Sequence, residues 1–287
     1  MIGRLTVFGA LAAWVFATPV AGGITFGPVR GKPGESVRLV SNSETPGGTV
    51  AKTSGGRNQR GTIMARQSRD LVWTFRADAP DGTRRGMVKV NDLSSSSEVV
   101  IEGKSEKTAD SSPLKGKLFA LSKAPAGEWK FELDGSVPMT RVTHEITELT
   151  HYLKREWFPD RSVEIGDSWE FDPAWVKAVI QKDLANAKTI GTMRLRQVRR
   201  TTDRETAVID ISIRSTGSDY RPDGSQSSAA IELDGQMTVN LATMLDELLE
   251  LKGTVTTGSG RVGESTAAKL PVKLVVTKSF VRDAALP

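Results

Sequence analysis

Alternating apolar and polar residues run through most of this chain, and this alternation constrains the fold more than any other feature. In the stretch 231–241, apolar residues occupy alternate positions: Ile231, Leu233, Met237, Val239 and Leu241. Similar runs occupy 71–77, 129–137, 207–213, 249–255 and 272–280. A two-residue period with one polar side is typical of antiparallel strands that pack one face on a core. The sequence therefore predicts a mainly β protein of curved antiparallel sheets.

Two segments follow a helical period instead. Asp172 and Pro173 form a helix start signal before 174–185, where the apolar residues fall on one helical face. A second helix is expected near 143–156, where apolar residues recur every three or four positions. With one or two helices the fold class becomes α+β. Runs rich in Ser, Gly and Thr predict loops at 41–60, 94–97, 215–228 and 256–267.

An internal repeat is suggested by four short matches in the same order. The paired segments are 34–37 with 166–169, 61–67 with 191–197, 114–118 with 233–237, and 133–135 with 251–253. They predict two related β-rich halves, 24–140 and 160–287, joined by a helical connector over 141–159. Gly116 would then be equivalent to Gly235, and Gly135 to Gly253. A glycine on the core side of a strand predicts a bend or the close approach of another element.

The N-terminal segment resembles a secretory signal peptide. Arg4 precedes an uncharged apolar run over 5–17, and small residues follow at 21–23. We expect residues 1–22 to be removed by cleavage near 21–23, which places the protein in the periplasm or outside the cell. An uncleaved N-terminal anchor is the alternative. The chain has no cysteine, so its stability must come from buried area rather than from disulfides.

Several chemistries find little support in the residues. Without cysteine, thiolate nucleophiles and Cys-based metal sites are excluded. His144, Glu148 and His151 could share a helix face, but no further histidine supports a metal site, and we expect none. Gly258–Gly263 matches the dinucleotide fingerprint only formally, because it lies between expected antiparallel strands. No catalytic motif and no cofactor are therefore predicted, although a Ser-His-Asp triad without a sequence signature stays open.

Two groups of residues are candidates for binding. One is an aromatic set around the expected helices, which could line an apolar cavity or simply pack the helices onto the sheet: Trp157, Phe158, Trp169, Phe171 and Trp175. The other is an arginine patch, which could bind anions or could be the solvated face of a strand: Arg194, Arg196, Arg199 and Arg200. The net charge is only +5, and with the expected export it argues against nucleic acid as a partner.

The segment from Phe158-Pro159 to Gly166-Asp167-Ser168-Trp169 is similar to one in uncharacterised secreted bacterial β-rich proteins. In those proteins a Phe-Pro segment, a Val-x-x-Gly-Asp-Ser-Trp turn and later glycine-containing hairpins recur. The motif implies structure rather than catalysis. More loosely, a curved antiparallel sheet with a helix across it resembles open-barrel carriers of the lipoprotein-localisation type, which bind acyl chains.

These observations favour a non-enzymatic, exported cell-envelope protein that binds a lipid or another apolar or amphiphilic ligand. Contact with a membrane surface or an envelope protein is a further expectation. Two alternatives are an envelope scaffold or interaction protein without a small ligand, and a hydrolase with an unsignalled triad.

Overall fold

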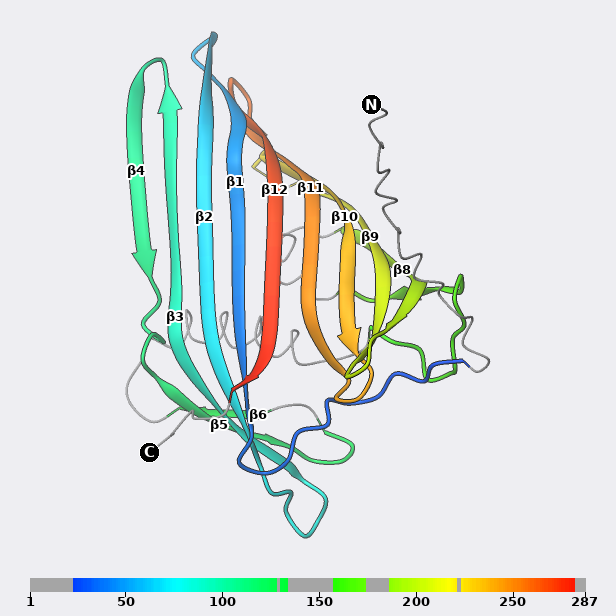
Figure 1. Cartoon of the computed structure of the whole chain (residues 1–287). Helices are drawn as coiled ribbons and strands as arrows, with labels where there is room; N and C mark the ends of the chain where they lie inside the picture. The colour runs from blue at the N-terminus through cyan, green and yellow to red at the C-terminus, as the bar shows by residue number, and fades with distance from the viewer. Residues whose placement is uncertain (1–22, 128–129, 134–156, 174–185, 221–222, 282–287) are drawn as a thin grey trace, which may run out of the picture.

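The computed structural model describes residues 23–127, 130–133, 157–173, 186–220 and 223–281. In this part the chain forms one antiparallel 12-stranded sheet, which curls along its length (Figure 1). The order is β6-β5-β3-β2-β1-β12-β11-β10-β9-β8-β7, and β4 pairs with β3. The strands are β1 Ser36–Ser54, β2 Arg57–Arg76, β3 Arg84–Ile101, β4 Lys104–Ser111, β5 Leu118–Lys123, β6 Lys130–Leu133, β7 Ser168–Phe171, β8 Lys188–Arg200, β9 Glu205–Tyr220, β10 Gln226–Asn240, β11 Leu245–Arg261 and β12 Glu264–Val281.

On one side of β1 the strands follow in ascending order, from β2 outward, and on the other side they follow in descending order, from β12 to β7. Hairpins connect β1 to β2 and β11 to β12, and β1 also pairs with β12 from Ser36–Val281 to Ser54–Glu264. At the β1–β2 turn Gly55 and Gly56 both have positive φ, 57° and 76°, as a two-residue type I′ turn requires. The first and last strands are thus neighbours, and the outer edges of the sheet fall at β6, β4 and β7.

Hydrophobic burial is concentrated on one face, here called the core face; the other is the solvent face. The larger cluster includes Ile209, Met237 and Leu251 from β9, β10 and β11. A smaller cluster centres on Val90 and Phe119. The predicted parity is confirmed, because Ile231, Leu233, Met237 and Val239 of the apolar set are each at most 3% exposed. A mainly β, antiparallel fold is therefore confirmed.

The expected helices at 143–156 and 174–185 lie outside the described residues, and no helix occurs in the part that the structure describes. The expected halves 24–140 and 160–287 contribute to one continuous sheet, joined through β1 and β12. Their relation as repeats, and most of the connector at 141–159, stay predictions.

One of the four repeat matches corresponds to a shared turn. Gly34 and Gly166 both have positive φ, 90° and 100°, just before β1 and β7 begin. Their amides donate to the carbonyl oxygens of Phe75 and Leu195, at 2.8 and 2.7 Å. In both turns an acidic side chain accepts the amide three residues earlier, from Lys32 and Glu164 respectively. The bond from the Glu164 amide, with a second from Arg161, lowers the pKa of Asp167.

The proposed equivalence of Gly116 and Gly235 is wrong. Gly116 lies in a turn with φ of 79° and open space around it, whereas Gly235 lies inside β10. Leu114, two residues before Gly116, is fully buried although it lies in the turn. Its spacing from Gly116 therefore resembles the two-residue period of a strand. Gly135 lies outside the described residues, so its pairing with Gly253 stays a prediction.

The atoms nearest to a Cβ at Gly235 and Gly253 belong to the adjacent strand, not to a crossing helix or an opposite sheet. A Cβ built on Gly235 would lie 1.8 Å from the Glu250 carbonyl oxygen, and one on Gly253 would lie 1.8 Å from that of Glu232. Gly235 on β10 is approached by the backbone of β11, and Gly253 on β11 by the backbone of β10. The two glycines are diagonal neighbours in the β10–β11 ladder. Neither site can take a side chain without a shift of the backbone.

The four segments expected to be loops are largely strand. Residues 41–54 and 57–60 belong to β1 and β2, and 94–97 lie within β3. Most of 215–228 and 256–267 likewise extends the β9–β10 and β11–β12 hairpins. These strand ends carry polar residues on both faces, so their sequence lacks the apolar alternation that marks a half-buried strand.

The solvent face of the sheet carries hydrogen-bonded ion pairs between neighbouring strands. Arg38 on β1 binds Asp70 on β2 at 3.0 and 2.6 Å, and Arg214 on β9 binds Asp234 on β10 at 2.9 and 2.8 Å. Hydrogen bonds from these arginines lower the pKa of both aspartates, against the opposing effect of burial.

We expect these aspartates to contribute stability that acid removes. A carboxylate whose folded-state pKa lies below its unfolded value stabilises the fold above the unfolded pKa, about 3.9. That contribution disappears as the pH falls through the lower folded-state pKa. Urea unfolding between about pH 6 and pH 2 should show a shallower acid decline for the double variant D70N/D234N than for the wild type. Parallel curves would contradict this assignment.

Candidate functional site

A single row of paired residues crosses the core face from β7 to β4, and its side chains change from apolar to polar halfway. Its order, taken from the strand register, is Trp169, Met193, Ile211, Gly235, Leu251, Leu274, Ser43, Gln67, Ser95 and Asp110. From β7 to β12 the side chains in this row are apolar or absent. From β1 to β4 they are hydroxyl, amide or carboxyl groups. The boundary falls between β12 and β1.

The neighbouring row repeats the change. Leu249 and Val276 on β11 and β12 are followed by Ser41 on β1 and Arg69 on β2. Ser41 is only 7% exposed, so its hydroxyl lies at the edge of the packed region. Toward the other end of β1, apolar residues return at Leu39 and Leu71. The polar area therefore borders apolar residues along β1 and β2 as well as across the boundary to β12.

A shallow, open hollow lies within this polar area. The polar residues that line it on the core face are Ser43, Thr45, Gln67, Ser95, Ser97 and Thr108. They come from β1, β2, β3 and β4, so the hollow is about 14 Å across at the usual strand spacing. We call it the hydroxyl hollow. Sequence reasoning placed most of these residues in loops, although Ser41, Ser43 and Thr45 continue the parity of the apolar Val37 and Leu39.

The apolar side of the boundary is partly accessible. Leu270, Val272 and Leu274 share the core face of β12 and are only partly buried, in contrast to Leu251 on the next strand, which is 2% exposed. Alternate residues of a strand lie about 6.6 Å apart, so these three form an apolar strip about 13 Å long. Leu274 pairs directly with Ser43, which brings this strip to the rim of the hydroxyl hollow.

Four residues of the aromatic set come together at the other end of the sheet, and Trp175 lies outside the described residues. Trp169 and Phe171 face the core from β7, and the indole nitrogen of Trp169 donates to the Trp157 carbonyl oxygen at 2.8 Å. Phe158 stacks on Phe26 with ring centroids 4.5 Å apart. Phe26 was missed because it lies in no periodic run. These rings pack against one another, and ligand contact through them stays a prediction.

The arginine patch lies on β8, and its cations have nearby partners. Arg196 lies 3.6 Å from Asp210, and Arg200 binds Glu205 at 2.7 Å. Arg194 pairs in the strand register with Asp210, and Arg199 can donate to the Gln197 side-chain oxygen at 2.7 and 2.9 Å. Carboxylates thus compensate much of the positive charge, as on a solvated strand face. Anion binding by the patch stays a prediction.

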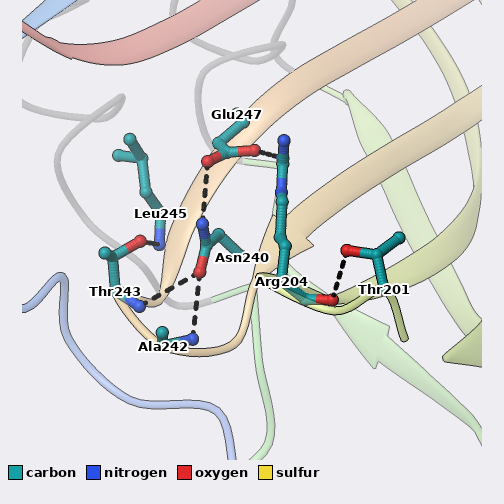
Figure 2. Close-up of polar contacts among 7 residues, drawn as sticks. All are labelled: Thr201, Arg204, Asn240, Ala242, Thr243, Leu245 and Glu247. Atoms are coloured by element: carbon teal, nitrogen blue, oxygen red, sulfur yellow. Dashed lines mark hydrogen bonds and ion pairs between the residues drawn. The ribbon is translucent and has the colours of Figure 1, made fainter. Parts of the chain in front are cut away.

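A nearby network ties the turn after β8 to the turn after β10 (Figure 2). Glu247 forms an ion pair with Arg204 and accepts a hydrogen bond from the Asn240 amide at 3.0 Å. The Asn240 oxygen accepts the amides of Ala242 and Thr243, at 3.0 and 3.3 Å. These bonds hold a turn in which Met244 has a positive φ of 57°. Arg204 is therefore a structural residue of this network.

A charged pair is buried on the core face beside this turn. The Lys278 ammonium contacts the Asp246 carboxylate, and the two side chains are 11% and 6% exposed. Lys278 lies opposite Leu39 on β1, and Asp246 lies opposite Val239 on β10. The pair therefore joins β11 to β12 within apolar surroundings, where loss of either partner is costly.

The remaining sequence candidates lie outside the described residues or in a hairpin. His144, Glu148 and His151 lie outside the described residues, and among the described ones no group of three acidic or histidine side chains could hold a metal ion. Gly258–Gly263 forms the end of β11 and the hairpin turn to β12, not a strand-to-helix loop. No described helix is long and apolar enough to cross a membrane.

Comparison with known proteins identifies no family. Neither models of protein families nor functionally characterised sequences match the chain. Among solved structures, OccK7 (OpdD) of Pseudomonas aeruginosa aligns with 87% of this chain and 100% of its own, at 7% identity and a TM-score of 0.28. A DUF1329 family protein of Desulfovibrio piger aligns over 86% and 87%, at 10% identity and a TM-score of 0.16. At these scores the likenesses do not indicate a shared fold or function.

Proposed function

We propose that this is a non-enzymatic protein of the cell envelope that binds an amphiphilic molecule on the core face of its sheet. The observation that carries the proposal is the boundary between β12 and β1. There the apolar strip of Leu270, Val272 and Leu274 borders the hydroxyl hollow. An amphiphile would place its chain along the strip and its polar end in the hollow. The signal-like N-terminus supports a location in the envelope.

Native mass spectrometry tests this directly. Protein purified from its own envelope should carry a long-chain molecule that is released on unfolding. A mature protein without any bound molecule, which also fails to bind long-chain amphiphiles below their micelle concentrations, would instead favour an envelope scaffold.

A matched pair of variants localises the chain site. Leu274→Ser should weaken binding of a dodecyl amphiphile about tenfold, because burial of a leucine side chain contributes about 1.5–3 kcal/mol. Val275→Ser is the control, since Val275 is the next residue of β12 and lies on the solvent face with similar burial. Calorimetric titration below the micelle concentration measures both. Equal losses in the two variants would argue against the strip.

A further inference from the structure

We infer that the hydroxyl hollow receives an uncharged, hydroxyl-bearing head group, such as a sugar, of the proposed amphiphile; this inference rests on the proposed function. The hollow is lined by serine and threonine hydroxyls and by the Gln67 amide. Each of these groups both donates and accepts hydrogen bonds. Sugar hydroxyls have the same dual character, so each can find a complementary partner on this surface.

The lining of the hollow argues against an anionic head group. Among its described lining residues only Arg66 is charged, and its Nε lies 3.8 Å from Glu44, opposite it on the solvent face. On the core face, Asp110 on β4 pairs with Ser95, and Arg69 lies two residues from Gln67 on β2, so the charges beside the hollow have both signs. A phosphate or sulfate accepts hydrogen bonds and favours arginine or lysine forks. The core-face lining of the hollow supplies hydroxyls and an amide instead.

The position of the hollow favours a head group over a free sugar. A similar hollow on the solvent face includes Ser68, Ser94 and Ser111, but Asn42 on β1 separates it from Val275, whose neighbours on that face of β12 are polar. Only the core-face hollow adjoins the apolar strip. Weak hydrogen bonds to one polar group and burial of a chain would therefore act together on the same molecule.

The experiment compares probes that share a dodecyl chain: dodecyl maltoside, dodecylphosphocholine and dodecyl sulfate, each below its micelle concentration, with free maltose as a fourth probe. Dodecyl maltoside should bind most tightly, and maltose should bind at least about 100-fold more weakly, because it lacks the buried chain. Gln67→Leu and Ser95→Val should each weaken maltoside binding about three- to tenfold, the cost of one hydrogen bond. Neither change should weaken dodecyl sulfate binding.

Thr62→Val serves as the control, because Thr62 is exposed on the solvent face of the same strand as Gln67. Equal affinities for all three head groups, or equal losses for all probes in Gln67→Leu, would overturn the inference and leave chain binding in place. Maltose binding as tight as the maltoside would assign the hollow to free sugars. Absence of binding by every dodecyl probe would overturn the proposed function together with the head-group inference.

Discussion

Alanine at position 235 should destabilise the protein by about 3 kcal/mol or more, because the new methyl group overlaps the backbone of the next strand. The added Cβ would lie 1.8 Å from the Glu250 carbonyl oxygen and 2.9 Å from the Leu251 Cα. Backbone atoms of a paired strand cannot rotate away, so β10 and β11 must separate locally. Chemical denaturation of the purified variant measures the loss as a lower midpoint.

Gly47→Ala is the matched control for this substitution. Gly47 lies in β1 and has no atom within 4 Å of its hypothetical Cβ. Alanine there should be neutral or stabilising by up to about 1 kcal/mol, since it restricts the unfolded chain. A stability gain for Gly235→Ala similar to that of Gly47→Ala would show that the strands do not approach as closely as described.

Removing the Lys278 ammonium should cost about 3–5 kcal/mol, because it leaves the Asp246 carboxylate buried without its cationic partner. Lys278→Met keeps an apolar stem and removes the ammonium group with its charge and its hydrogen bond, so the change in the free energy of unfolding reports the loss of that group. The double variant Lys278→Met/Asp246→Leu should recover most of the stability, since two apolar side chains can replace a buried ion pair.

Lys273→Met is the control for Lys278→Met, because it replaces an exposed lysine in the same way. Lys273 lies on the same strand, is exposed and faces solvent opposite Glu44. Its replacement should change stability by less than about 0.5 kcal/mol. If Lys278→Met cost no more than Lys273→Met, the buried pair would be irrelevant to stability.

The sequence predicted the strands that bury one face. It did not predict the strand segments that have both faces exposed. Ile231 and Leu233 alternate with polar residues because one side packs on the core, and that pattern is visible without a structure. All eight residues of β4 are exposed, so its pairing leaves no apolar trace in the sequence. Backbone hydrogen bonds to β3 hold it, and these depend on no particular side chain.

The candidate site was hidden for the same reason. Ser43 and Ser95 look like loop residues, and only the strand register shows that they share a face with Leu274. Sequence reasoning did find the aromatic residues Trp169 and Phe171, whose alternation on β7 is local. It could not find Phe26, because that ring meets Phe158 through a long-range contact.

The pairing of β1 with β12 has a consequence for the order of events during folding. Ser36 and Val281 are neighbours in the sheet although they lie 245 positions apart in the sequence. A chain that emerges from its N-terminus forms the β1–β2 hairpin early, and then holds β1 as an exposed edge until the last long strand has been made. Closing so long a loop is slow, and an unpaired strand edge invites association with other chains. The β1 edge is therefore where an unfinished chain is most exposed to mispairing.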